Sequence, residues 1–101
     1  MALKGKDRRR LRAEGHHLSP VVQVGQQGVT AGVIAAADQA LSDHELVKVK
    51  ISADAPLDRH QTAEALAKET RAEVAQVLGR TALLFRKRKE KSKFEDLPGG
   101  E

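Results

Sequence analysis

Residues 20–51 read PVVQVGQQGVTAGVIAAADQALSDHELVKVKI and contain two strand patterns separated by one helix pattern. Ser19-Pro20 forces an extended backbone before the β-branched run from Val21 to Val24, which is typical of a strand. Thr30 is a natural N-cap, and apolar residues recur at helical spacing from Ala31 to about Ser42. The stretch therefore predicts a strand, a glycine-containing loop, a helix and a second strand.

The second strand, Leu46–Ile51, alternates strictly between apolar and basic residues over its last five positions. Alternation places Val47, Val49 and Ile51 on one side and sends Lys48 and Lys50 to the other. We expect one face of the sheet to be covered and the other to be wet.

The flanking residues extend this pattern in both directions. Asp7 to about Glu14 reads as a short basic helix with Asp7 placed to cap it, and Asp58 with Gln61 resembles the capping box of a third helix. Two apolar runs joined by Gly79-Arg80-Thr81 then predict a hairpin, formed by Val74–Leu78 and Ala82–Phe85. The predicted fold is α+β with the order αβαβαββ, a mixed four-stranded sheet and all helices packed on one face.

Length and composition limit the class of protein. A chain of 101 residues accommodates one domain, and it has no cysteine, which excludes disulfides and thiolate metal sites. No stretch approaches the roughly 18 apolar residues of a membrane span, and the start lacks a secretion signal. The lack of cysteine allows a reducing compartment, and we expect a cytoplasmic monomer with no membrane association.

The positive charge is concentrated at the two ends. Residues 1–12 hold six basic side chains against one acid, and residues 86–101 hold six against four, whereas the rest of the chain is mildly acidic. This distribution suits a polyanion binder, but solvated tails that keep a small protein soluble would look the same. Beyond Arg88 the composition turns basic, then acidic and Gly/Pro-containing, so we expect residues 89–101 to be a disordered tail after a domain at residues 1–88.

The loop Gly25-Gln26-Gln27-Gly28 is the one local feature with a binding mechanism. Two glycines allow close approach of a backbone, and the following helix N-terminus presents free N–H groups to phosphates. KH domains clamp nucleic acid with such a GXXG loop, although a Gly-x-x-Gly segment before a helix is commonly only a turn.

The combination of HHLSPVVQVGQQG, HELVKVKI and GRTALLFR over about residues 7–88 resembles the CRM domain in its bacterial stand-alone, YhbY-like form. The resemblance implies a fold similar to the C-terminal domain of translation initiation factor three. It also implies RNA binding centred on the GXXG loop, with precursor large ribosomal subunits as the partner. Gln26 and Gln27 are neutral where many relatives carry a basic residue, which puts the charge contribution of the loop in doubt.

No arrangement of His, Ser or carboxylates indicates catalysis, so we expect no enzyme, no metal, no cofactor and no small-molecule substrate. With two phenylalanines as the only aromatics, base stacking is disfavoured relative to contacts with the backbone and shape of structured RNA. His16 is interpreted as a structural hydrogen-bonding residue near the first strand. The alternative function is a protein-docking module whose basic ends are only solubilising. The predicted RNA-binding residues are Gly25, Gln26, Gln27, Gly28, Lys48, Lys50, Arg80, Arg8, Arg9, Arg12, Arg86, Lys87 and Arg88.

Overall fold

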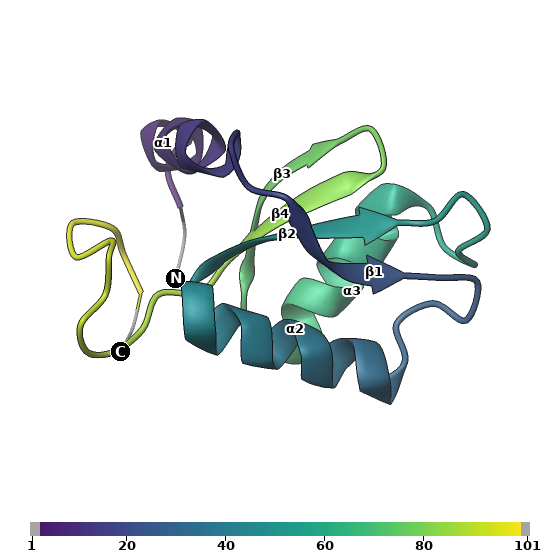
Figure 1. Ribbon diagram of the computed structural model, residues 1–101. Helices are drawn as coiled ribbons and strands as arrows, with labels where there is room; N and C mark the ends of the chain where they lie inside the picture. Colours follow the sequence, from purple (N-terminus) through teal and green to yellow (C-terminus); the bar gives the residue numbers. More distant parts are fainter. Residues whose placement is uncertain (1–2, 100–101) are drawn as a thin grey trace.

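The computed structural model describes residues 3–99 and has three helices and four strands in the predicted order (Figure 1). The α+β class and the αβαβαββ order are confirmed. The elements are α1 (Gly5–Gly15), β1 (Pro20–Val24), α2 (Ala31–His44), β2 (Leu46–Ile51), α3 (Arg59–Thr70), β3 (Glu73–Leu78) and β4 (Thr81–Phe85).

The sheet has the strand order β1-β2-β4-β3. Helix α2 carries the chain back so that β2 pairs parallel with β1, and α3 carries it to the far edge. The hairpin turn at Gly79, where φ is 57°, then returns β4 into the space between β2 and β3, antiparallel to both. The sheet is mixed, as predicted.

The inner face of the sheet carries the main hydrophobic core. Helices α2 and α3 lie against it (Figure 1), and their buried Leu41 and Leu66 meet the strand residues Val49 and Leu84. The capping box predicted for α3 is present, because the N–H of Gln61 donates to Asp58 at 2.8 Å and the Gln61 side chain accepts from the N–H of Asp58. Burial of this apolar surface, at about 25 cal/mol per Å², is the main driving force for the fold.

The prediction that all helices pack on one face is wrong for helix α1. It lies on the outer face of the sheet (Figure 1), where Leu11 is fully buried with Leu46, Leu83 and Phe85 in a second core. The pattern of β2 did not reveal the outer core, because its outward-facing residues at 48 and 50 are lysines. Leu46, which precedes the alternating positions, points outward with Lys48 and is the apolar residue that β2 contributes to this core. The helix also begins at Gly5, before Asp7, and the Asp7 carboxylate caps it by accepting from the N–H of Lys4 at 2.9 Å.

The C-terminal segment, residues 86–97, corrects the prediction of disorder beyond Arg88. Phe94 and Leu97 are 6% and 5% exposed and complete the outer core, with the Phe94 ring edge-to-face against Phe85 at 5.2 Å. Polar composition suggested disorder, but two apolar side chains three residues apart pack into the outer core and help to dock the segment. Residues 100–101 of the expected tail lie outside the described residues.

Candidate nucleic-acid interface

The loop between β1 and α2 is a tight turn closed by its own backbone. The N–H of Gly28 donates to the carbonyl of Gly25 at 3.0 Å, and the Thr30 side chain accepts from the N–H of Val33 at 3.2 Å. Gln26 and Gln27 are exposed between the two glycines. The turn therefore presents two amide side chains just ahead of the α2 N-terminus, where the helix dipole favours anions.

The two glycines of this loop have different reasons to be glycine. Gly28 has a φ of 76°, and an added Cβ would lie 2.9 Å from Pro56, so the fold itself requires a glycine there. Gly25 has open space where a Cβ would be, and its φ is outside the left-handed region. The fold therefore leaves Gly25 free to be replaced, and a requirement for glycine at that position would come from a ligand.

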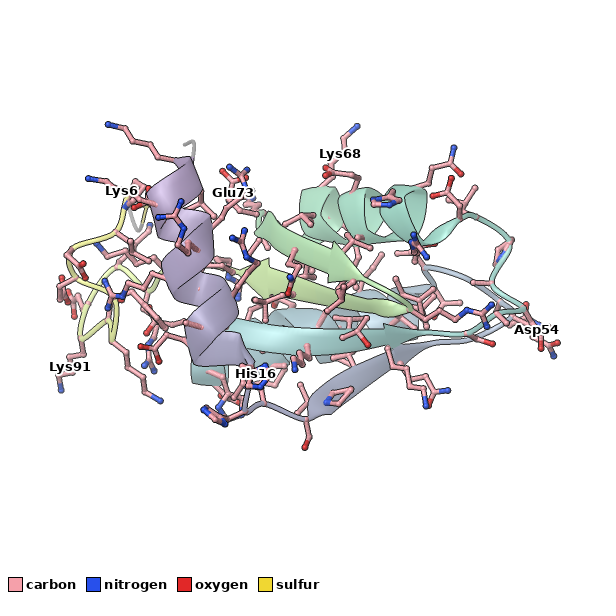
Figure 2. All side chains as sticks on the ribbon, turned by 90° about the horizontal axis from the view of Figure 1, so that it is seen from above. Lys6, His16, Asp54, Lys68, Glu73 and Lys91 are labelled. Carbon is pink, nitrogen blue, oxygen red and sulfur yellow. The ribbon has the colours of Figure 1, made fainter. Side chains whose placement is uncertain are left out.

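Arg80 lies at the same end of the sheet as this loop. Its carbonyl accepts from the N–H of Ile51 at 2.7 Å, which places the β3–β4 turn beside the end of β2. Arg80 also lines a hollow with Arg59 and His60 at the N-terminus of α3. Asp54 lies at this tip as well (Figure 2), so the charge here is mixed.

The outer face of the sheet contains two rows of aligned residues beside and beyond α1. Strand register aligns Pro20, Lys48, Leu83 and Gln76 in the first row, and Gln23, Lys50, Thr81 and Leu78 in the second. Viewed from above, α1 crosses the strands at one end of this face and leaves the other end uncovered (Figure 2). The two rows contain two lysines and no acid, and we call them the open face.

Helix α1 divides its arginines between the protein and solvent. Arg8 donates to the carbonyls of Leu3 at 2.6 Å and Val74 at 3.5 Å, and Arg10 pairs with Asp96 while lying over the Phe94 ring. The side chains of Arg9 and Arg12 are exposed and form no hydrogen bond or ion pair with residues 3–99.

Three basic residues that follow β4 were predicted to bind RNA. The side chains of all three have partners within the protein. Arg86 donates to Asp38 at 2.6 Å and to the carbonyl of Thr70 at 2.8 Å, which closes the end of α3. Lys87 donates to the carbonyls of Glu95 and Leu97. Arg88 pairs with Glu45. These side chains hold the C-terminal segment and the two helices in place.

Glu45 is the central anchor of the C-terminal segment. It is 0% exposed, has a φ of 66°, and accepts from the backbone N–H groups of Arg88 and Lys93 at 2.8 Å each and from the Ser92 hydroxyl. Burial by itself raises the pKa of Glu45, but these hydrogen bonds outweigh it and hold the pKa below the ordinary value. A charged carboxylate therefore organises this end of the molecule.

Comparison with known proteins places this fold and loop in a family. The model of the CRS1/YhbY (CRM) domain matches residues 3–86. The chain belongs to the CRM domain family. It is similar to "Probable RNA-binding protein YqeI" of Bacillus subtilis, at 39% identity over 92% of this chain and 97% of that protein. It is 45% identical to "Probable RNA-binding protein MJ0652" of Methanocaldococcus jannaschii over 91% of this chain and 69% of that protein.

A solved structure agrees with the fold of this CRM domain. The solution structure of the protein SAV1595 from Staphylococcus aureus superposes with a TM-score of 0.81 at 35% identity, and the match covers 96% of this chain and all of that one. The match with the family model ends at Arg86, so most of the C-terminal segment lies beyond it.

Sequence reasoning missed Gln76 on the open face. The register of β3 shifts between Val74 and Gln76, and this bulge puts Ala75 in the outer core while Gln76 faces outward opposite Leu83. Bulges commonly redirect a side chain near a functional surface. His16, interpreted as a hydrogen-bonding residue, is exposed, and its ring meets His17 edge-on.

Residues 3–99 lack two further features. They contain no group of three or more His, Asp or Glu side chains placed to hold a metal ion. Within the same range, the helices are too short or too polar to cross a bilayer.

Proposed function

We propose that this protein binds RNA through the Gly25–Gly28 loop, the open face and Arg80, and that its partner is the RNA of the precursor large ribosomal subunit. In this role it assists ribosome assembly as a monomer in the bacterial cytoplasm, without catalysing a reaction. The names of its relatives support RNA binding in general, and the specific partner is inferred from the family resemblance.

One observation carries the proposal: the side chains of Lys48, Lys50 and Arg80 form no hydrogen bond or ion pair with residues 3–99, although they lie in a molecule rich in carboxylates. Lys48 and Lys50 are about 7 Å apart along β2, since a strand rises about 3.3 Å per residue. Cations held on a sheet without a protein acceptor are available to phosphate oxygens.

A salt titration of RNA binding tests this proposal. If about six phosphate contacts form, log K should fall against log salt with a slope of roughly −4. Lys48→Glu with Lys50→Glu should weaken binding strongly and reduce the slope, while the melting temperature stays near that of the parent.

Lys68→Glu with Lys89→Glu is the control of equal charge, because both lysines are exposed and lie away from the open face. Equal losses of RNA affinity for the two double variants would contradict the proposed interface. A flat response of binding to salt would favour a protein-docking module. Sedimentation of a cell extract tests the ribosomal partner, since the protein should migrate with precursor large subunits.

A further inference from the structure

A groove of about 520 Å³ lies where α1 meets the first row of the open face. Arg12 and His16 line it from α1 and the turn that follows, and Lys48, Gln76, Leu78 and Leu83 line it from the sheet. Figure 2 shows this corner beside α1, with His16 at the end of the helix. No carboxylate lines the groove.

The groove is lined by groups that can contact the phosphate and the base of one nucleotide. Arg12 and Lys48 have no protein partner within residues 3–99 and supply positive charge for a phosphate. The Gln76 amide can donate to and accept from the edge of a base. Leu78, which is 69% exposed, and Leu83 supply an apolar wall.

The local structure keeps these groups in place. The bulge in β3 turns Gln76 toward the groove, as described above, and the close packing of Gly15 fixes the end of α1 on Leu83. A Cβ at Gly15 would lie 2.8 Å from Leu83 Cδ1, so any larger residue there would require the buried Leu83 side chain to shift. The groove is therefore a consequence of rigid elements and does not depend on a loop.

The size and position of the groove favour unpaired nucleotides over an RNA duplex. A volume of about 520 Å³ is in the range of small-ligand sites and is too small for a duplex. Helix α1 also stands above the sheet on the same face (Figure 1), so it blocks a rigid helix from lying flat there. Unpaired nucleotides can turn outward and expose their hydrogen-bonding edges.

A larger hollow of about 600 Å³ provides a contrast. It is lined by Arg86, Lys87 and Arg88, but Asp38 and Glu69 line it too, and its three named cations are bonded within the protein. Only the groove beneath α1 combines partner-free cations with an acid-free lining among the hollows described for residues 3–99.

We propose that this groove receives one unpaired nucleotide of an otherwise structured RNA, with Arg12 and Lys48 on its phosphate and Gln76 on its base. The inference rests on the proposed RNA-binding function and refines it. A protein that reads mainly backbone and shape would thereby distinguish RNA with a bulge from a continuous duplex.

The test compares two RNA hairpins that differ only in a short bulge of unpaired nucleotides in the stem. The parent protein should bind the bulged hairpin several-fold more tightly. Arg12→Ala should weaken binding of the bulged hairpin about fivefold to tenfold, which corresponds to about 1 to 1.4 kcal/mol. Lys6→Ala, which removes the same charge from an exposed position of the same helix outside the groove, should change the affinity at most about twofold.

Gln76→Leu separates recognition of the base from attraction by charge. It should remove much of the preference for the bulged hairpin and leave the salt slope unchanged, since no charge is altered. Gln76→Ala gives a second measurement if the leucine variant does not fold. Melting temperatures of all variants identify any loss of fold.

Equal affinity of the parent for both hairpins would overturn the groove inference while leaving the proposed function intact, provided that both affinities fall steeply with salt. Equal losses for Lys6→Ala and Arg12→Ala would also overturn it, because net charge alone would then explain the effect. Absence of salt-dependent binding to either hairpin would reject the proposed function itself, and the groove inference with it.

Discussion

The basic residues at the end of β4 and those on the open face have the same charge but different surroundings. Arg86 and Lys87 donate to carboxylate or carbonyl oxygens of the protein, whereas Lys48 and Lys50 have no such acceptor within residues 3–99. The first pair stabilises the docking of helices and of the C-terminal segment. The second pair remains available to a ligand.

This difference shows that a cluster of basic residues in a sequence does not by itself locate a binding surface. A guanidinium with four hydrogen bonds to its own protein, as in Arg86, would have to break them to contact RNA. Arg10 and Arg88 are likewise paired with acids. The proposed site therefore lies on the open face and the loop end, whereas Arg86, Lys87 and Arg88 form bonds within the protein.

Removal of the Glu45 carboxylate should give the largest effect on stability. Glu45→Ala leaves the N–H groups of Arg88 and Lys93 without their acceptor, and we expect a loss of about 3–5 kcal/mol in the free energy of unfolding. Chemical denaturation measures it. An unchanged midpoint would mean that the C-terminal segment contributes little to the fold.

The same carboxylate predicts a dependence of stability on pH. Because the folded state lowers the pKa of Glu45, the stabilisation is present above the ordinary value of 4.5 and is lost as pH falls through the lower folded pKa. Glu45→Gln should reduce this acid sensitivity. Parallel curves of stability against pH for the parent and Glu45→Gln would contradict the assignment.

Arg86→Ala and Lys50→Ala each remove one positive charge, but the first should change stability and the second should change RNA binding. Arg86→Ala should lower the free energy of unfolding by about 1.5–3 kcal/mol, through loss of its charge-assisted hydrogen bonds. Lys50→Ala should leave the melting temperature near that of the parent and reduce the salt slope of RNA binding by about 1. A loss of RNA affinity in a folded Arg86→Ala protein matching that of Lys50→Ala would remove the distinction between the two regions.

The loop glycines sharpen the comparison within the proposed site. Gly25→Val should fold, because its Cβ meets open space, yet it should weaken RNA binding about tenfold if the RNA backbone approaches the loop closely. Gly28→Val should lose stability first, through strain at its φ of 76° and contact with Pro56. Parental affinity in Gly25→Val would show that this loop is only a turn.

The smallest effect should come from the neutral pair in this loop. Gln26→Ala with Gln27→Ala should cost about 1 kcal/mol of RNA binding, the scale of one or two neutral hydrogen bonds. Asp at both positions should cost more, since two negative charges would face the phosphates. If the Ala and Asp double variants bound RNA with the same affinity, the loop would not contact the RNA.

The sequence by itself determined the order of elements, the capping of α2 and α3 and the inner face of β2. These features depend on contacts between residues close in the chain: Thr30 with Val33, Asp58 with Gln61, and the alternation along one strand. Such local signals persist whatever the rest of the chain does. The motif containing Gly25 and Gly28 was visible for the same reason.

Only the tertiary structure decided which face α1 covers, whether the C-terminal segment is ordered and which cations are free. Each depends on a partner far away in the sequence: Leu11 on Leu83, Phe94 on Phe85, and Arg88 on Glu45. A polar tail and a docked segment can have the same composition, because two buried apolar side chains and one buried carboxylate decide between them. The bulge that turns Gln76 outward follows from the strand register, which is fixed only when β3 pairs with β4.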